Sequence, residues 1–301
     1  MTGLGALIRR NTKLYFKDKG MFFTSLITPM ILLVLYSTFL GNVYEDSFRS
    51  ALEAAGASVS DKLIWGCVGG QLVSSLLAVS CVTVAFCSNL LMVQDKTTGS
   101  RQDLTIAPIS QSTLSLSYYL STLCSTLLIS LAATAVCLGY LAMVGWFLTA
   151  ADVAALVLDV VLLVIFGTAL SSCVIFPLST NGQASAVGTI ISAGYGFVCG
   201  AYMPISSFSE GLQKVISFLP GSYGTSLLRN HALRGVFQEM ATQGFPTEVV
   251  EAIRDSVDCN LYFFDHRVEL GGMYTVLITS IVVLIGLFIV MTLLSQRKRR
   301  G

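Results

Sequence analysis

The chain has 301 residues, of which 54% are hydrophobic and only 12% are charged, and its formal net charge is +1. An ordinary soluble domain carries about 25% charged residues, so this composition excludes a water-soluble fold. It also gives no support for nucleic-acid binding. Because the apolar residues gather in blocks long enough to cross a bilayer, which takes about 20 helical residues, we expect an integral membrane protein.

Six apolar blocks follow one another along the chain. Polypeptide inside lipid must satisfy its own backbone hydrogen bonds, which permits helices or a closed barrel. The blocks lack the period-2 alternation of barrel strands, and Pro204 ends the fifth because proline has no N–H to donate. The predicted fold class is therefore all-α, with six transmembrane helices. Their expected ranges are 22–40, 63–93, 114–148, 153–176, 184–203 and 273–294.

Basic residues near the helix ends predict the orientation, because lysine and arginine gather on the cytoplasmic side. We expect the inner (plasma) membrane, both termini in the cytoplasm, and a first helix that is retained, since its flanks do not suit a signal peptide. The basic residues concerned are Arg9, Arg10, Lys13, Lys17 and Lys19 before the first helix, Lys96 and Arg101 after the second, and Arg297, Lys298, Arg299 and Arg300 after the sixth.

Three segments outside the apolar blocks have helical patterns of their own. Residues 4–16 form an amphipathic pattern that suits the inner headgroup layer. Residues 208–228 are half apolar and broken by proline and glycine, which predicts a short re-entrant element in the outer leaflet. Residues 246–257 fit an outer amphipathic helix. The expected layout of this single transmembrane domain is 1–20 amphipathic helix, 22–93 helices one and two, 94–113 cytoplasmic loop, 114–203 helices three to five, 204–272 re-entrant element and acidic outer loop, 273–294 helix six and 295–301 basic tail.

Reactive groups are scarce within the blocks. Asp159 is the one clear ionisable residue there, and such groups are costly in a membrane. It suits either a proton or cation relay or a carboxylate that is hydrogen-bonded to a neighbouring helix. The second reading is favoured because no other span offers an evident basic partner. No phosphate loop or hydrolase motif occurs, and His231 and His266 lack metal-ligand spacing, so we expect no enzyme activity, metal or cofactor in this chain.

The eight cysteines are expected to be mainly unpaired structural thiols. Seven lie in apolar stretches, where cysteine behaves as a small hydrophobe, and only Cys259 lies in a polar segment. A disulfide between Cys67 and Cys199 is the alternative.

The loop after the second block carries a family resemblance. Residues 94–110 read QDKTTGSRQDLTIAPIS. This is similar to the acidic-x-x-x-Gly-Thr-x-Glu-x-Leu…Pro-Ile/Val loop of type-2 ATP-binding-cassette (ABC) exporter permeases. Thr97 occupies a frequently acidic position, and Gln102 replaces an acidic residue. The matching positions are Asp95, Gly99, Ser100, Gln102, Leu104 and Pro108.

A second segment, from Met203 to Arg229, resembles the stretch that links helices five and six in that family. It reads MPISSFSEGLQKVISFLPGSYGTSLLR. The six-helix layout and the basic ends extend the resemblance over nearly the whole chain, whereas the acidic segment 238–272 goes beyond the shorter members. The residues in matching order are Pro204, Leu212, Leu219, Pro220, Tyr223 and Arg229.

The resemblance implies a permease that works as a pair of halves, identical or related, each bound to a separate ABC ATPase subunit that holds ATP and magnesium. It implies alternating access, an outer gate at the second segment, contact with membrane lipid, and an amphipathic or lipid-like substrate such as a drug, peptide, lipid or glycan. Mixed charges would suit reversible docking of the loop on the ATPase. The expected ATPase contacts are Asp95, Lys96, Gly99, Ser100, Arg101, Gln102, Asp103, Leu104 and Pro108, with Arg9, Arg10, Lys13 and Lys17 of the N-terminal helix.

Two other functions compete with this expectation. A proton- or sodium-coupled carrier would use Asp159. A membrane-embedded enzyme or an assembly scaffold would account for the large polar outer segment, although no reactive constellation accompanies it.

Overall fold

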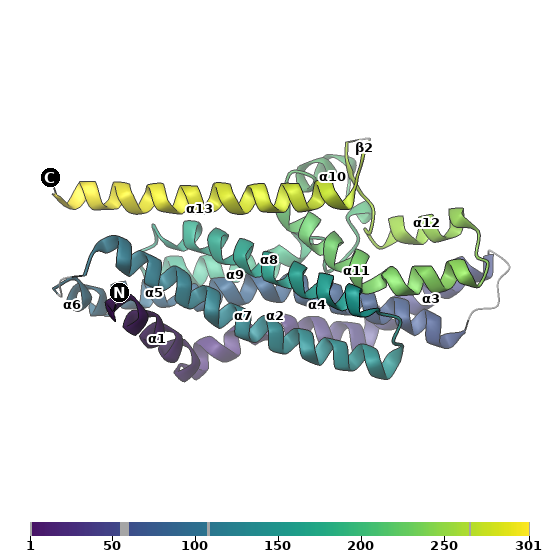
Figure 1. Cartoon of the computed structure of the whole chain (residues 1–301), viewed down its shortest axis with the longest axis horizontal. Helices are drawn as coiled ribbons and strands as arrows, with labels where there is room; N and C mark the ends of the chain where they lie inside the picture. Colours follow the sequence, from purple (N-terminus) through teal and green to yellow (C-terminus); the bar gives the residue numbers. More distant parts are fainter. Residues whose placement is uncertain (1, 55–59, 107–108, 265, 301) are drawn as a thin grey trace.

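The computed structural model of the chain describes residues 2–54, 60–106, 109–264 and 266–300, and it is an elongated helical bundle with one β-hairpin (Figure 1). The end of the bundle that carries α1, α6 and the C-terminus of α13 is called the proximal end. The opposite end, which carries α3 and α12, is called the distal end. The elements are α1 (Thr2–Lys17), α2 (Lys19–Leu35), the π-helix η1 (Tyr36–Leu40), α3 (Gly41–Ala54), α4 (Asp61–Asn89), α5 (Leu91–Thr97), α6 (Ser100–Ile106), α7 (Gln111–Val144), α8 (Ala150–Ile175), α9 (Asn181–Val198), the 3₁₀-helix η2 (Ile205–Ser207), α10 (Glu210–Ile216), α11 (Pro220–Thr242), α12 (Thr247–Ser256), β1 (Leu261–Phe263), β2 (His266–Val268) and α13 (Leu270–Arg300).

Within the described residues, five helical segments are long and apolar enough to cross a membrane, which agrees with the predicted all-α membrane class. They correspond to five of the six predicted blocks. The remaining block is α9, a helix of 18 residues that begins with polar Asn181 and Gln183. It is not among the candidate membrane spans of the described residues. The count of six spans therefore stays a prediction. The five segments are Lys19–Ser50, Asp61–Thr97, Gln111–Val144, Ala150–Ile175 and Leu270–Arg297.

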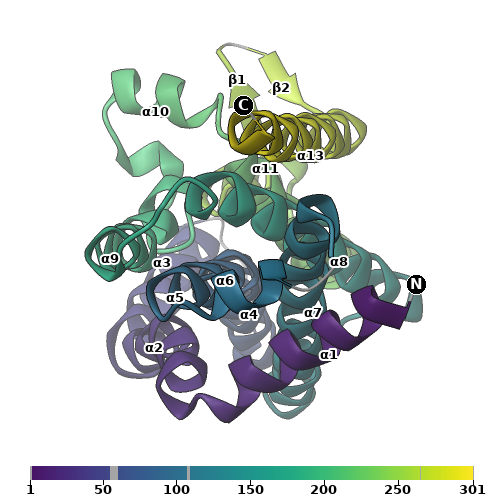
Figure 2. The same ribbon diagram turned by 90° about the vertical axis from the view of Figure 1, so that its left-hand side faces the viewer.

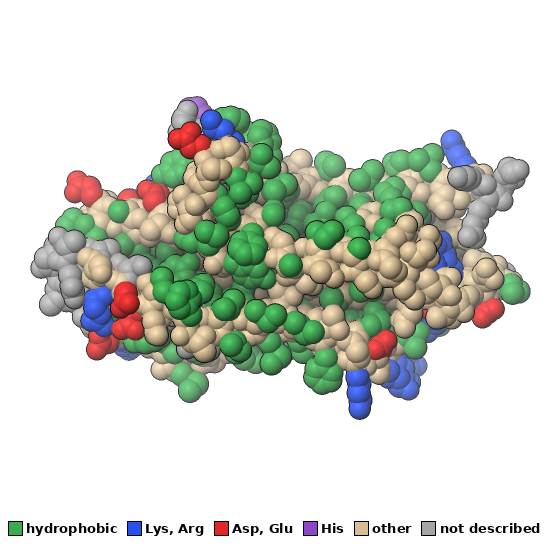
Figure 3. Space-filling model, turned by 180° about the vertical axis from the view of Figure 1, so that it is seen from behind, with side chains coloured by type: hydrophobic (Ala, Val, Ile, Leu, Met, Phe, Trp, Pro, Cys, Tyr) green, Lys and Arg blue, Asp and Glu red, His purple; other side chains and the backbone are tan. Residues whose placement is uncertain are grey.

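Helix α4 is the centre of the bundle. Its apolar window is 94% buried, whereas the windows of the other four candidate spans are 22% to 50% buried. It contacts α2, α7, α8, α9 and α11. In the end-on view of Figure 2, α4 lies behind α5 and α6 in the middle of the bundle. Small residues allow this close packing: a Cβ at Gly66 or Gly70 would collide with neighbouring side chains. Outside this packed centre, apolar side chains cover the middle stretch of the bundle and charges lie toward its ends (Figure 3).

Capping groups set several helix ends. Asp18 separates α1 from α2 and accepts a hydrogen bond from the Met21 amide. Thr180 and Gln183 form a capping box at the start of α9. Helix α9 ends at Val198, five residues before the predicted end at Met203, because Gly200 adopts a left-handed conformation (φ +74°) that terminates the helix before Pro204 can.

The predicted short re-entrant element is two helices instead, α10 and the 23-residue α11. Pro220 occupies the first turn of α11, where a missing N–H costs nothing, so it starts a helix instead of breaking one. Gly221 and Gly224 give room to Tyr195 and Leu163, which lie against them. Most of α11 is buried against α4, α8 and α13, so the bundle contains a helix that the polar sequence of this region concealed.

The segment after α11 is folded against the distal end. Helix α12 confirms the predicted amphipathic helix over 246–257. Strands β1 and β2 pair antiparallel, with Leu261 opposite Val268, and were not predicted. All eight cysteines are free: Cys67 belongs to the distal hydrophobic cluster around Phe48 and Met240, and Cys199 to the main core, so the alternative disulfide is not formed.

Candidate functional sites at the two ends of the bundle

At the proximal end, Asp95 joins three elements. It lies on α5 with its side chain only 5% exposed, and its carboxylate accepts two hydrogen bonds from Arg10 of α1, at 2.7 and 3.1 Å. Tyr118 of α7 donates a third at 2.5 Å. The hydrogen bond and charge of Asp95 raise the pKa of the Arg10 guanidinium, which favours its protonated form. Sequence reasoning placed Arg10 and Asp95 in one interface but did not identify Tyr118.

Lys96 ties the same segment to α8. Its Nζ donates to the carbonyl oxygens of Phe176 and Leu178, both at 2.6 Å. These carbonyls follow the C-terminus of α8, where unpaired acceptors and the negative end of the helix dipole attract a cation. Asp95 is therefore buried and Lys96 half-buried, and both charged groups are engaged within the protein.

Helix α6 carries the exposed part of the predicted loop. Gly99 has φ +81°, a left-handed conformation that lets the chain turn from α5 into α6. Ile106 is 84% exposed at the end of α6, next to exposed Gln102, Asp103 and Thr105. Ser100 and Leu104 are half-buried, and Arg101 donates to Gln111. Pro108 lies outside the described residues.

The N-terminal helix has one buried and one basic side. Leu7 and Tyr15 are buried, and α1 packs along α7. Arg9, Lys13 and Lys17 are exposed. The amphipathic pattern thus turns its apolar side to the bundle and leaves cations at the proximal surface.

The residues predicted for an outer gate lie around α10 and α11. Leu212 is exposed on α10, Leu219 and Pro220 begin α11, and the buried Tyr223 donates to the Ser217 carbonyl at 2.6 Å. Pro204 precedes η2. Arg229 is the member of the set with the most hydrogen bonds.

Arg229 is fully buried and neutralised by a carboxylate that sequence reasoning did not assign. Its Nη1 donates to Asp258 at 2.9 Å, and its Nη2 donates to the Gly200 carbonyl and to Ser75 of α4. Asp258 also accepts from the Ile205 amide at 2.9 and 3.1 Å. One ion pair thus links α4, α11, the turn after α9 and the loop after α12. Burial of a charge demands such a partner.

Asp159 has partners that its sequence context did not reveal. Its Oδ2 lies 2.6 Å from His231 Nδ1 on α11, and its Oδ1 accepts from the Tyr274 hydroxyl at 2.6 Å on α13. The expectation that no neighbouring helix supplies a basic partner is wrong, because α11 was not recognised as part of the bundle. Both carboxylate oxygens are occupied, as the hydrogen-bonded interpretation requires.

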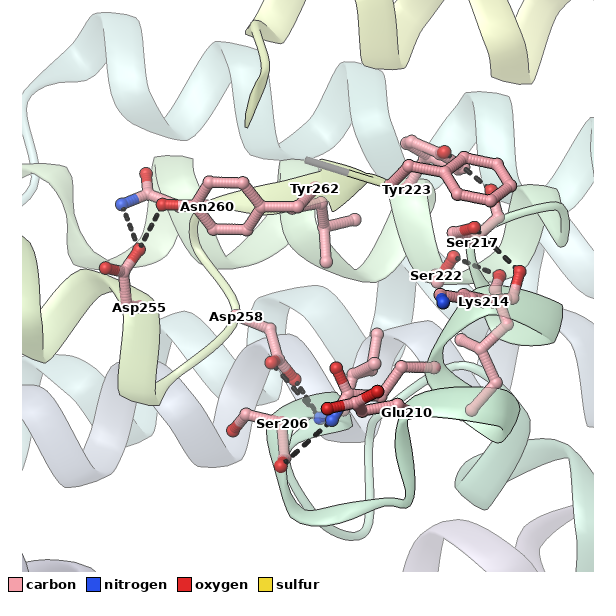
Figure 4. A pocket seen from close by; sticks show the side chains of 15 residues that line it. Ser206, Glu210, Lys214, Ser217, Ser222, Tyr223, Asp255, Asp258, Asn260 and Tyr262 are labelled. Atoms are coloured by element: carbon pink, nitrogen blue, oxygen red, sulfur yellow. Dashed lines mark hydrogen bonds between the residues drawn. The ribbon is translucent and has the colours of Figure 1, made fainter. Parts of the chain in front are cut away.

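Two of the cavities at the distal end lie on either side of the segment 202–206. The first, of about 590 Å³, lies between η2, α10, the start of α11 and the hairpin; Figure 4 shows Glu210 and Lys214 among its polar lining. The second, of about 650 Å³, is mainly apolar and lies between α3, α12 and the segment Tyr202–Pro204. Among the described residues, no group of three or more His, Cys, Asp or Glu side chains is placed to hold a metal ion.

Comparison with protein families gives a match to the family described as ABC-2 type transporter, over residues 2–232. The match covers more than half of the chain, and it ends within α11, before α12, the hairpin and α13. No curated protein matches the chain.

Proposed function

Because the chain belongs to the ABC-2 type transporter family, we propose that it is the transmembrane permease subunit of an exporter driven by separate ATPase subunits. The proximal end faces the cytoplasm in this proposal, in the inner membrane of the cell. ATP and magnesium bind to the ATPase partner. A second permease half, identical or related, completes the transporter.

The observation that carries the proposal is the way the α5–α6 segment is fixed to the bundle. Asp95 connects it to α1 and α7, and Lys96 connects it to the end of α8. A displacement of α6 by a partner is therefore transmitted to two candidate spans and to the N-terminal helix together. ATP-driven movement of the ATPase would use these bonds to shift the helices between inward-open and outward-open arrangements.

The docking surface in this proposal is the exposed side of α6. Ile106 offers an exposed apolar anchor and Asp103 a charged neighbour, so this surface combines an apolar centre with a polar rim, as protein interfaces do. Asp95 and Lys96 position this surface from within. The exposed Arg9, Lys13 and Lys17 of α1 form a second, electrostatic contact.

The proposed substrate is amphipathic or lipid-like. The buried charges described above, including Asp159 and Arg229, are engaged by neighbours, so they do not offer a route for a bare ion. Apolar side chains cover the middle of the bundle, where a molecule with an acyl or aromatic portion could enter sideways from the membrane. The outward direction of transport is what the family resemblance implies, and the orientation that the basic residues predict places the proximal end on the ATPase side.

The test is association with an ATPase. The chain would be co-expressed with the products of its neighbouring genes, including any ATPase subunit among them, and purified in nanodiscs. We expect a stable complex whose Kd rises at least tenfold on Ile106→Asp, because a charge would replace the apolar anchor. Thr105→Asp places the same charge one residue away and is the matched control. Failure of the unmodified chain to bind any ATPase, or equal effects of the two substitutions, would contradict the proposal.

An ion-coupled carrier that uses Asp159 is the competing function. The His231 and Tyr274 hydrogen bonds argue for a positioning role of Asp159 between α8, α11 and α13. Transport in proteoliposomes distinguishes the two: the exporter requires ATP, whereas the carrier works without ATP and stops when the ion gradient is collapsed.

A further inference from the structure

The two distal cavities share a wall that is two chain segments thick. On the first segment, Pro204 lines the apolar cavity and the next residue, Ile205, lines the polar one. On the second segment, Val257 lines the apolar cavity and Asp258 the polar one. Consecutive residues therefore face opposite cavities at both places, and the wall consists of the contact between the segments.

One carboxylate holds this wall together. Both oxygens of Asp258 accept from the Ile205 amide, at 2.9 and 3.1 Å, which joins the second segment to the first. The same carboxylate pairs with Arg229. Asp258 and Gly200 have φ values of +50° and +74°, so both turns at the wall use left-handed conformations. A Cβ at Gly200 would lie 3.3 Å from Asp258, which leaves little freedom there.

The Asp258–Arg229 ion pair allows the wall to open without leaving a buried charge unpaired. If Ile205 moves away, Asp258 keeps its ion pair with Arg229, and Arg229 keeps its bond to Ser75 of α4. An isolated buried carboxylate would oppose opening strongly, but a paired one does not. Opening has to break the hydrogen bonds from the Ile205 and Ser206 backbone to Asp258 and move the Ile205 side chain away from the core, but no buried charge loses its partner.

We propose that Asp258 is the latch of a gate in this wall, and that release of Ile205 joins the two cavities into one outward path for an amphipathic molecule. The inference rests on the proposed exporter function. The apolar cavity would hold the apolar body of the substrate. The polar cavity, with Glu210 and Lys214 on its lining, would receive a polar or zwitterionic head. Asp258 lies outside the residues 2–232 that the family match covers.

Ile205→Pro tests the latch because it removes the donor N–H. Position 205 begins η2, where proline is tolerated, and Pro204 already has the extended conformation (φ −59°, ψ 143°) that a following proline requires. Ile205→Ala is the matched control, since it also removes the side chain but keeps the N–H. The reporter is Val257→Cys, a position 1% exposed on the apolar side of the wall. Labelling by a membrane-impermeant maleimide would be measured in nanodiscs, with the ATPase partner, without and with ATP.

We expect Ile205→Pro to raise the labelling rate of the reporter at least tenfold over Ile205→Ala in the absence of ATP. In the Ile205→Ala background, ATP should raise the rate by itself. Equal rates in the two variants would overturn the proposal. Labelling of the native cysteines is subtracted by using the same variants without the reporter.

Asp258→Asn provides an independent variant. It weakens the acceptor of the Ile205 amide but also leaves Arg229 buried without a carboxylate, so labelling is compared only if its melting temperature matches that of the unmodified chain. Asp255→Asn is its control because Asp255 lines the same cavity without contacting Ile205. Faster labelling in Asp258→Asn alone supports the latch, and equal labelling contradicts it. The permease can be labelled without its partner. A failure to bind ATPase would therefore refute the proposed exporter function, while the labelling comparison would still test whether Asp258 holds the wall closed.

Discussion

The junction at Asp95 predicts how firmly the N-terminal helix is held to the bundle. Asp95→Ala would remove the acceptor of two bonds from Arg10 and one from Tyr118. A hydrogen bond to a charged group contributes about 1.5–3 kcal/mol, but the Arg10 side chain is 30% exposed and regains water. We therefore expect a net loss of about 2 kcal/mol in the docking of α1, which is roughly a 30-fold change in its opening equilibrium.

Limited trypsin digestion measures this opening. Lys13 lies on α1 and is exposed, but trypsin requires an unwound segment, so the cleavage rate follows the population of opened α1 when opening is fast. Cleavage at Lys13 should become about 10 to 30 times faster in Asp95→Ala and several times faster in Tyr118→Phe. Asp103→Ala, which removes an exposed carboxylate from α6, should leave it unchanged. A wild-type rate in Asp95→Ala would refute the idea that this ion pair fastens α1.

Three further outcomes are expected. Gly235→Ala should lower the melting temperature, because its Cβ would overlap the Phe147 carbonyl, an overpacking that costs about 1–3 kcal/mol; Gly188→Ala, with open space around it, should not. Burial raises the pKa of the Cys259 thiol to about 12, so maleimide should label it at pH 8 only after unfolding, and fast labelling of the folded protein would contradict its placement. Asp159→Asn should retain ATP-driven transport. Complete loss of transport in a normally folded Asp159→Asn variant would favour the ion-coupled alternative.

Long apolar runs made most of the spans predictable. The blocks that became α4, α7, α8 and α13 agree with the structure within a few residues, because lipid forces such runs to form helices. Helix α11 escaped detection for the opposite reason. It is buried in protein at the distal end, and its polar Arg229, Asn230 and His231 are satisfied there by neighbours that hydropathy cannot register.

The candidate sites were predictable as regions but not as contacts. The loop resemblance identified the segment around Asp95, yet nothing in the sequence indicated that Asp95 turns inward to Arg10 and Tyr118. Asp258 is one of several acidic residues in a long loop, and its burial depends on a partner 29 residues away. A lone arginine within an otherwise uncharged stretch, as at Arg229, is the one signal that could have prompted a search for such a partner.

The enclosed position of α4 has a consequence for biogenesis. Its surface carries Gln71, Ser74, Ser75, Thr83 and Asn89, all buried in the finished protein. When α4 first enters the bilayer, the later helices α7, α8 and α11 have not yet been synthesised, so these polar groups must face lipid or a chaperone. Translation of α11 closes the last major side of α4, and chains truncated before it should therefore be recognised by the cell's quality-control proteases.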